Sequence, residues 1–391
     1  MGFLFWRKKK EDKVSLKSKK ANGASVYRPF DVSLLFVVLL LVFVGIVMVF
    51  SSSAVLAKEN YHDTYYFLKK EIFFVTLGMV GLILGKNIPY RTYWKWIYPL
   101  YIATLALLMA ALLFGRGGKT GEVHRWIRLG PLSLQPSEMA KLVAVMFTAY
   151  ALAKKGEKVR QFSKGFLPVI LLSGVYILMI LAQKDLGGAA IIAILVFLML
   201  FVAGTKPVYL LGAFLASMPV LYFAIFSVAF RRQRILTFLD PWRNPQGAGF
   251  QIIQSFVAFK AGGFTGVGLG EGKQKLFYLP EAHTDFIFSV IGEELGMVGV
   301  LLVIALFTMV IFRGLLIALK TKEAFGMYLA FGITCLIGLQ AFFNMGVVMG
   351  ILPTKGLALP FISYGGSSLI TNLLAVGILL NISTESGKEA D

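Results

Sequence analysis

Ten long apolar segments recur between residues 33 and 383, and shorter polar segments separate them. A helix needs roughly 20 apolar residues to cross the hydrocarbon core of a bilayer. The pattern therefore predicts an all-α polytopic membrane protein with ten transmembrane helices, at residues 33–57, 70–87, 94–115, 137–153, 166–183, 186–205, 207–230, 285–313, 325–349 and 362–383. No internal repeat is visible, which disfavours a transporter built from inverted repeats.

The polar segments predict how these helices are oriented. Lysine and arginine are enriched in short cytoplasmic loops. Four basic segments share one side if the N-terminus is cytoplasmic: residues 1–30, 86–95, 154–164 and 319–323. Ten helices then return the C-terminus to the cytoplasm. We expect a basic cytoplasmic tail, a transmembrane domain with one long outer loop between its seventh and eighth helices, and a C-terminal cytoplasmic tail, at residues 1–30, 31–383 (loop 231–284) and 384–391.

Composition narrows the class of protein. The 391 residues are 57% hydrophobic and 15% charged, whereas a soluble domain is roughly 45–50% apolar and about 25% charged. A soluble enzyme is therefore excluded. A net charge of +19 would suggest nucleic-acid binding in a soluble protein. Here the charges lie between apolar runs, so we expect contact with membrane lipid and no nucleic acid. Cys335 is the single cysteine and cannot form an intrachain disulfide.

Two segments on the expected outer side are unusually basic. Residues 115–136 contain four Lys/Arg, and the 54-residue loop 231–284 contains seven against three acids. Basic residues on this side oppose the usual bias, although long loops tolerate them. The excess is either solvated surface charge or an electropositive cleft for an anionic, phosphate-bearing ligand.

Acidic residues near the outer boundary are candidates for acid–base chemistry. Asp285 lies where the long loop meets the eighth predicted helix. Thr284 or Asp285 could cap that helix, or Asp285 could act as a general base on a hydroxyl nucleophile. Glu293 and Glu294 lie two turns deeper in an apolar helix, where acids are costly and are either functional or paired.

Further polar groups lie at the ends of apolar segments. Glu138 and Lys141 are three residues apart, so they share a helix face and could simply neutralise each other. Residues 183–185 form a turn between the fifth and sixth predicted helices, where charges can be solvated without any function. The glycine-rich segment 262–272 could bind phosphate through backbone N–H groups, or could be only a flexible turn. The three histidines lack metal-ligand spacing, so no protein-encoded zinc site is expected.

Segment 352–372 interrupts two apolar helices with two prolines and three glycines. Irregular backbone at membrane depth is tolerated only against protein or a wet cavity. We therefore expect this segment to form the wall of a polar site. Lys355 could reach a phosphate from there, or extend to the membrane interface. Asn344 and Asn372 are expected to make hydrogen bonds between helices.

The motifs of this chain, in order and spacing, resemble those of the SEDS family of bacterial cell-wall proteins. They are Arg125-Trp126 with Gln135-Pro136-Ser137-Glu138; Asp185-Leu186-Gly187; Pro280-Glu281-Ala282-His283-Thr284-Asp285-Phe286; and Leu352-Pro353-Thr354-Lys355-Gly356 with Pro360-Phe361-Ile362-Ser363-Tyr364-Gly365-Gly366-Ser367-Ser368. The resemblance covers roughly residues 30–383. The Glu-Ala-His-Thr-Asp and Pro-Thr-Lys-Gly sequences are similar to division-type and sporulation members. Lys184 stands where the family commonly has proline.

The resemblance implies an inverting peptidoglycan glycosyltransferase outside the bacterial cytoplasmic membrane. It would polymerise lipid II into β-1,4 glycan strands and release undecaprenyl pyrophosphate. The resemblance places the catalytic base at Asp285. It places substrate-binding residues at Arg125, Gln135, Glu138, Lys141, His283, Lys355 and Ser363. Of these, Arg125, Lys141 and Lys355 would neutralise charge that develops on the departing pyrophosphate.

The resemblance also implies a cofactor and partners. A divalent cation, Mg²⁺ or Mn²⁺, would bind with the substrate pyrophosphate instead of in a preformed protein cage. The expected partners are a class B penicillin-binding protein, which is a transpeptidase, and other membrane proteins of the division complex. Two other functions are left open: a lipid II flippase or transporter using the outer cavity, and a noncatalytic scaffold that recruits the transpeptidase.

Overall fold

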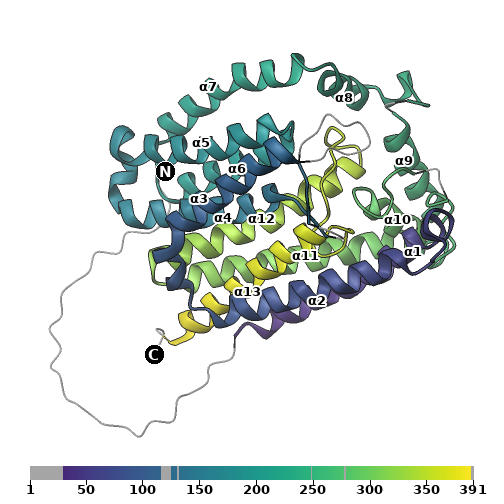
Figure 1. The fold of residues 1–391 in the computed structure, drawn as a ribbon, viewed down its shortest axis with the longest axis horizontal. Helices are drawn as coiled ribbons and strands as arrows, with labels where there is room; N and C mark the ends of the chain where they lie inside the picture. The colour runs from purple at the N-terminus through teal and green to yellow at the C-terminus, as the bar shows by residue number, and fades with distance from the viewer. Residues whose placement is uncertain (1–29, 116–124, 130–131, 248, 277–278, 389–391) are drawn as a thin grey trace, which may run out of the picture.

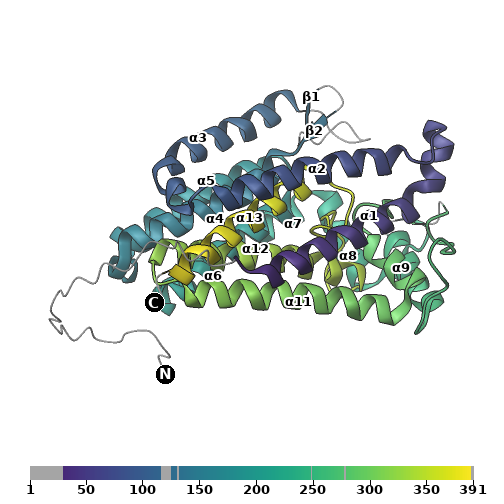
Figure 2. The same cartoon turned by 90° about the horizontal axis from the view of Figure 1, so that it is seen from below.

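The computed structural model describes residues 30–115, 125–129, 132–247, 249–276 and 279–388. Most of its long helices run lengthwise beside one another (Figures 1 and 2). The helices are α1 (Val32–Tyr61), α2 (Tyr66–Asn87), α3 (Tyr90–Phe114), α4 (Pro136–Lys155), α5 (Leu167–Ala182), α6 (Leu186–Val202), α7 (Pro207–Phe226), α8 (Ala229–Leu239), α9 (Phe250–Gly262), α10 (Ile287–Glu294), α11 (Gly296–Lys320), α12 (Ala324–Val348) and α13 (Gly366–Lys388). Strands β1 (Ile127–Leu129) and β2 (Leu132–Leu134) form a small antiparallel hairpin, and short helical turns occur at Gly156–Arg160, Phe162–Phe166 and Pro241–Arg243.

The all-α prediction is confirmed, and each predicted span is largely helical. Within the described ranges, seven helices are long and apolar enough to cross a membrane: α1, α3, α5 with the turn before it, α7, α11, α12 and α13. Helix α6 is apolar but has only 17 residues. Helices α2 and α4 carry charged side chains near their N-termini, such as Glu71 and Lys141.

The eighth predicted helix is interrupted. Residues 285–313 do not form one continuous helix: α10 begins at Ile287, and α10 and α11 are separated at Leu295. Gly296 has a φ of 63°, which glycine adopts without steric cost. The N–H groups of Met297 and Val298 donate to the carbonyl oxygens of Gly263 and Phe264, at 3.0 and 3.2 Å. The loop after α9 therefore binds at the break, and the prediction of a single helix is wrong there.

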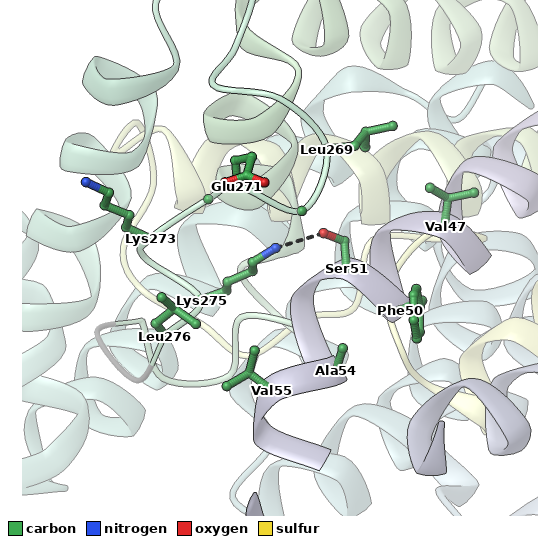
Figure 3. A pocket seen from close by; sticks show the side chains of 12 residues that line it. Val47, Phe50, Ser51, Ala54, Val55, Leu269, Glu271, Lys273, Lys275 and Leu276 are labelled. Atoms are coloured by element: carbon green, nitrogen blue, oxygen red, sulfur yellow. Dashed lines mark hydrogen bonds between the residues drawn. The ribbon is translucent and has the colours of Figure 1, made fainter. Parts of the chain in front are cut away.

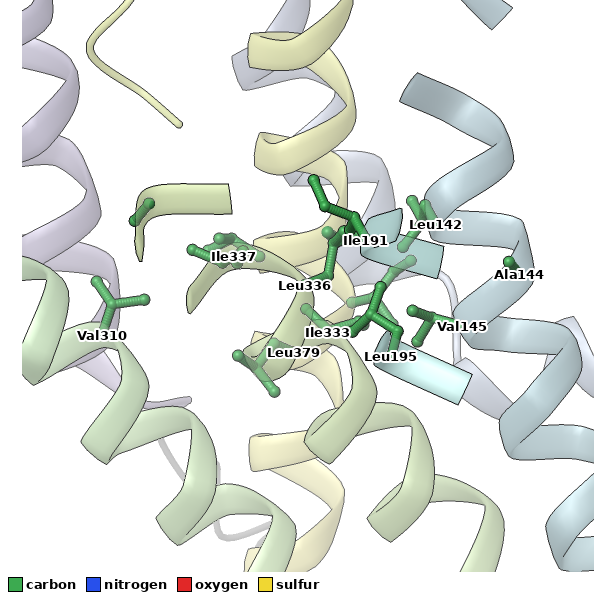
Figure 4. Packing of buried hydrophobic residues seen from close by; sticks show 14 of the residues in the cluster. Leu142, Ala144, Val145, Ile191, Leu195, Val310, Ile333, Leu336, Ile337 and Leu379 are labelled. Atoms are coloured by element: carbon green, nitrogen blue, oxygen red, sulfur yellow. The ribbon is translucent and has the colours of Figure 1, made fainter. Parts of the chain in front are cut away.

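The apolar core lies where α4, α6, α12 and α13 meet. Figure 4 shows side chains of these helices packed together: Leu142, Val145, Ile191, Leu195, Ile333, Leu336, Ile337 and Leu379. In their most apolar stretches, 78% of the residues of α13 are buried but only 6% of those of α7. Helix α7 runs along the top of the bundle in Figure 1 and leads into α8. It is therefore a peripheral helix, whereas α13 is central.

Glycines let α2 and α13 approach closely. A Cβ at Gly377 of α13 would lie 2.2 Å from the carbonyl oxygen of Leu82 in α2. A Cβ at Gly85 of α2 would lie 2.7 Å from the carbonyl oxygen of Leu374. Small residues at such crossings allow backbone-to-backbone packing inside membranes. This packing holds the start of α13, and hence the irregular segment before it, against the bundle.

Candidate functional site

Residues 281–286 form a tight turn that presents Asp285 just before α10. The N–H groups of Thr284 and Phe286 both donate to the carbonyl oxygen of Glu281, at 3.1 and 3.2 Å. Glu281 has a φ of 57°, a left-handed conformation that is uncommon outside glycine. Helix α10 begins without a side-chain cap. The alternative in which Thr284 or Asp285 caps this helix is therefore wrong.

The carboxylate of Asp285 faces the loop between α12 and α13. A Cβ at Gly356 would lie 2.6 Å from Oδ2 of Asp285, so a larger residue would push the carboxylate away. Nδ2 of Asn344 donates to the backbone carbonyls of Asp285, at 2.8 Å, and of Leu357. Asn344 thus ties two loops to α12 instead of bonding to another helix as predicted. Asn372 also departs from that prediction, because it bonds within its own helix.

Asp285 has the protonation behaviour of a general base. Burial raises the pKa of Asp285 to about 7, and Glu281 adds to this effect while Arg234 and Arg125 oppose it. A base is most efficient when its pKa lies near the operating pH. The side chain is only partly buried, so a substrate hydroxyl can reach it.

Lys355 lies in the loop between α12 and α13, which faces Asp285. Its side chain extends to Asp185, at the start of α6. Its Nζ is 3.5 Å from Oδ1 of Asp185, and it makes no hydrogen bond within the described ranges. Asp185 begins α6 and accepts a hydrogen bond from the N–H of Gly188, at 3.1 Å. A Cβ at Gly187 would lie 1.5 Å from Nζ of Lys355. Glycine at this position therefore makes room for the lysine.

Charge and burial act on this pair in opposite directions. Burial lowers the pKa of Lys355 to about 8, although Asp185 opposes the shift. Burial alone would raise the pKa of Asp185, but Lys355 and Arg125 outweigh it and hold that pKa below its ordinary value. Asp185 is 5% exposed, so the alternative of a merely solvated charge is wrong for Asp185, whereas Lys184 is exposed. The ammonium group of Lys355 is held by a 3.5 Å ion pair with Asp185 and not by a hydrogen bond, so it has donors left for an anionic ligand.

Arg125 bonds to the turn before α6 and acts electrostatically on the carboxylates of Asp185 and Asp285. Its Nε donates to the carbonyl oxygen of Gln183 at 3.1 Å, and its Nη2 donates to that of Lys184. Lys184 has a φ of 61°. Arg125 also lowers the pKa values of Asp185 and Asp285. Its guanidinium charge therefore favours the ionised form of both aspartates.

Glu138 and Lys141 form a buried ion pair at the start of α4. Nζ of Lys141 is 2.9 Å from Oε1 of Glu138, and Gln340 of α12 donates to the other carboxylate oxygen at 3.4 Å. The predicted pairing is confirmed, and a role of either residue in substrate binding stays a prediction. Lys141 also contributes to the lowered pKa of Asp185, which brings this pair into the electrostatic surroundings of Lys355.

The other three predicted substrate residues make structural contacts. The backbone N–H of Gln135 donates to Oγ of Ser367 at 3.0 Å. Oγ of Ser363 accepts from the N–H of Leu359 at 2.8 Å. The ring of His283 packs against Phe67 and Tyr364, with centroids 4.7 and 5.7 Å apart. Their roles in substrate binding stay predictions.

Two arginines were missing from the predicted site. Nη1 of Arg234 in α8 donates to the carbonyl oxygen of Thr354 at 3.2 Å. Arg231 lies within the electrostatic influence of Arg125 and Asp185. The signal in the sequence was the run Arg231-Arg232-Gln233-Arg234 at the start of the long loop. Nothing in that run indicates that Arg231 comes under the influence of Asp185 and Arg234 under that of Asp285.

A second buried charge cluster lies at the other end of α10. Nζ of Lys275 is 2.6 Å from Oε1 of Glu294, which also accepts from Oγ of Ser51 in α1. Glu293 accepts from the backbone N–H groups of Lys273 and Gln274, at 2.8 and 3.2 Å. The paired alternative is confirmed for Glu294, whose partner is Lys275, whereas Glu293 is bonded by backbone N–H groups.

The glycine-rich segment before α10 bonds to these glutamates. The N–H groups of Val267 and Gly268 donate to the carbonyl oxygens of Glu293 and Glu294, both at 3.0 Å. The N–H of Gly270 donates to Oε2 of Glu294 at 3.1 Å. These donors are used within the protein, which favours a structural turn over a phosphate-binding loop.

A cavity of about 490 Å³ opens beside this second cluster, between α1 and residues 269–276. Figure 3 shows Lys275 reaching Ser51, while apolar side chains of both elements line the opening: Val47, Phe50, Val55, Leu269 and Leu276. Asp285 and Lys355 do not line it. This cavity is therefore separate from the candidate site.

Replacing Gly266 by alanine is expected to destabilise the protein by about 1–3 kcal/mol more than the same change at Gly270. Both glycines have positive φ, 84° and 88°. A Cβ at Gly266 would lie 2.2 Å from the carbonyl oxygen of Glu294, whereas a Cβ at Gly270 has open space. Both substitutions cause similar backbone strain, so the difference between their stabilities measures the steric contact at Gly266. Denaturant unfolding in detergent micelles measures it, and equal losses would contradict the close packing.

Comparison with known proteins gives a consistent result. The family model FtsW/RodA/SpoVE, described as a cell cycle protein, matches residues 31–388. The chain is 51% identical over 365 residues to the probable peptidoglycan glycosyltransferase FtsW of Geobacter metallireducens, covering 93% of this chain and 97% of that protein. It is 39% identical over 356 residues to the stage V sporulation protein E of Bacillus subtilis, covering 91% and 97%.

Solved structures agree with the sequence comparisons. A chain from a peptidoglycan synthase complex that coordinates polymerization and crosslinking matches with a TM-score of 0.75 and 33% identity, over 91% of this chain and 98% of that one. The rod shape determining protein RodA of Thermus thermophilus matches with a TM-score of 0.67 and 28% identity, over 90% and 96%. The similarity therefore includes the arrangement of the helices.

Proposed function

This chain belongs to the FtsW/RodA/SpoVE family of cell cycle proteins, and we propose that Asp285 is the general base of its active site. The protein is a multi-pass inner-membrane protein and a peptidoglycan glycosyltransferase. The observation that carries the proposal is the position of Asp285. It is a reachable carboxylate with a pKa of about 7, in a site that also contains Arg125 and Lys355.

The reaction joins two lipid-linked sugars, with lipid II as the substrate. Asp285 takes the proton of the acceptor 4-hydroxyl, and the oxygen attacks the anomeric carbon of the donor. The bond from that carbon to the pyrophosphate oxygen breaks, and its electron pair leaves with undecaprenyl pyrophosphate. Attack opposite the leaving group inverts an α-linked donor into a β-1,4 glycan. The pyrophosphate therefore gains negative charge as Asp285 gains the proton.

Cationic side chains of the site can stabilise this developing charge. Lys355 makes no hydrogen bond within the described ranges that a ligand would have to break. Arg125 is close enough to lower the pKa values of Asp185 and Asp285. Preorganised charges aimed at a leaving group stabilise the transition state without reorganisation. Lys141 is paired with Glu138 and helps to lower the pKa of Asp185, so its effect on the site is indirect. We assign direct contact with pyrophosphate to Arg125 and Lys355.

The divalent cation would be bound mainly by the substrate. Within the described ranges, no group of three His, Cys, Asp or Glu residues could hold a metal ion. The donor groups of the described residues therefore do not fit a resident metal cage. Mg²⁺ and Mn²⁺ bind readily to pyrophosphate oxygens, so we propose that the cation enters with lipid II. None of the steps assigned to the protein side chains depends on it.

The remaining features of the proposal concern the membrane and partners. We propose ten spans, cytoplasmic termini and an outer active site, supported by the basic segments at 86–95 and 154–164 on the opposite side. The similarity to a chain of a peptidoglycan synthase complex supports a transpeptidase partner of the class B penicillin-binding type. The relatives named FtsW support a septal role in division.

Polymerisation is expected to show a bell-shaped pH dependence. Asp285 must be ionised to accept a proton, so kcat/KM should fall about tenfold per pH unit below its pKa of about 7. Lys355 must be charged to hold an anion, so activity should also fall above its pKa of about 8. Fluorescent lipid II, supplied to the protein and its transpeptidase in liposomes with Mg²⁺, reports glycan on a gel. Lys355→Arg should remove the alkaline limb, because arginine stays charged.

The same experiment separates the alternatives. Glycan from the wild type establishes the polymerase reaction in the purified complex, and an acid limb unrelated to Asp285 would overturn its assignment as base. Transport of lipid II across the liposome without glycan would favour a flippase. Neither product, with the transpeptidase still bound, would favour a scaffold.

A further inference from the structure

Two of the three arginines of helix α8 lie on its partly buried face. Arg231 and Arg234 are three residues apart and so share a helix face. Both are partly buried, whereas Arg232 is exposed. Nη1 of Arg231 donates to the carbonyl oxygen of Ala224 in α7 at 2.7 Å, and Nη1 of Arg234 donates to that of Thr354 at 3.2 Å. Backbone carbonyls from α7 and from the loop of Lys355 therefore position the two guanidinium groups.

The surroundings of both groups disfavour positive charge. Burial lowers the pKa of Arg231 and Arg125 lowers it further, while Asp185 opposes them. Burial and Arg125 likewise lower the pKa of Arg234, against Asp285. Arginine nevertheless stays protonated in proteins. The fold therefore bears the electrostatic cost of placing Arg231 and Arg234 near the charge of Arg125, and a bound anion would relieve that cost.

We propose that Arg231 and Arg234, together with Arg125, bind the pyrophosphate of the lipid-linked donor. The assignment rests on the proposed glycosyltransferase mechanism and deepens it by locating the leaving group. A guanidinium fork binds phosphate oxygens in a bidentate manner. Asp285 would take the proton of the acceptor hydroxyl, while the α8 arginines would stabilise the negative charge on the pyrophosphate that leaves the donor. The donor site would then lie between α8 and the loop of Lys355.

Helix α7 favours a polyprenyl donor over a nucleotide sugar. It leads directly into α8 and exposes large apolar side chains, among them Tyr222 and Phe223 at 66% and 74%. Arg231 is bonded to this same helix through Ala224. A polyprenyl chain could therefore follow the apolar surface of α7 while its pyrophosphate lies at α8.

Product inhibition tests the site directly. Undecaprenyl pyrophosphate and undecaprenyl monophosphate are each added to the lipid II polymerisation reaction of the wild-type complex and its variants. Arg231→Gln and Arg234→Gln should each raise the inhibition constant of the pyrophosphate roughly 10- to 100-fold, the usual range for a lost hydrogen bond to a charged group. The constant for the monophosphate should change less. Arg232→Gln is the matched control and should behave like the wild type.

The kinetics separate donor from acceptor, since both lipids carry pyrophosphate. A donor site predicts a lower kcat, because charge develops on the leaving group in the transition state. An acceptor site predicts a higher KM at unchanged kcat, which would overturn the proposal, as would unchanged inhibition constants. If the glutamine variants fail to fold, Arg231→Lys and Arg234→Lys keep the charge but remove the fork, and they should show the same loss in smaller measure. Failure of the wild type to polymerise would contradict the proposed function itself.

Discussion

Replacing Asp285 by asparagine is expected to reduce glycan polymerisation by roughly 100- to 10,000-fold, the range that a general base contributes. Asparagine has nearly the same size and can keep the contact with Gly356, but it cannot accept the proton of the acceptor hydroxyl. The measurement is the rate of glycan formation from fluorescent lipid II by the complex with its transpeptidase. Glu271→Gln, which removes an exposed carboxylate from the same outer segment, is the matched control and should keep the wild-type rate.

Stability distinguishes a lost base from a damaged fold. The pKa of Asp285 is raised to about 7 in the folded protein, from an ordinary value of 3.8. A raised carboxylate pKa favours the folded state only at low pH, and that contribution is lost as pH rises through about 7. At pH near 8 the asparagine variant should therefore unfold at the same temperature as the wild type or higher. A folded variant that keeps more than about a tenth of the activity would remove Asp285 from the role of base.

The second large effect is expected at the buried pair of Lys275 and Glu294. Their side chains are 5% and 0% exposed, with Nζ and Oε1 2.6 Å apart. Removing one partner of a buried ion pair leaves the other charge uncompensated and typically costs about 3–5 kcal/mol. Lys275→Met should therefore lower the free energy of unfolding by about that amount. Lys273→Met is the matched control, because Lys273 bonds to Glu293 through its backbone N–H.

A double variant tests the origin of this loss. In Lys275→Met with Glu294→Leu, neither charge is buried, so much of the lost stability should return. Denaturant unfolding of the three variants in detergent micelles gives the comparison. Equal stability of Lys275→Met and Lys273→Met would show that the pair contributes nothing to the fold.

Local patterns in the sequence were enough for the helices and for several site residues. Apolar runs of bilayer length predict helices because the hydrophobic gain on burial is a sum over neighbouring residues. Each predicted segment is largely helical, although the eighth is broken at Leu295. The resemblance identified Asp285, Lys355 and Arg125, and the structure brings all three into one electrostatic cluster. The pairing of Glu138 with Lys141 also followed from their spacing on one helix face.

The tertiary structure decided which polar groups meet. Asp185 looked like a solvated turn residue, but burial and Lys355 make it part of the site. The run at Arg231–Arg234 did not indicate which arginines face inward, because that depends on where α8 packs against Thr354.

What the sequence by itself determined is the membrane class, the helices and a short set of candidate residues, because each depends on composition or spacing along the chain. Only the tertiary structure decided the break at Gly296, the enclosure of Glu294 and the side on which the α8 arginines act. These depend on desolvation and on partners far apart in the sequence. The electrostatic free energy of a charged side chain is determined by groups close to it in space but far from it in the sequence, which no local pattern encodes.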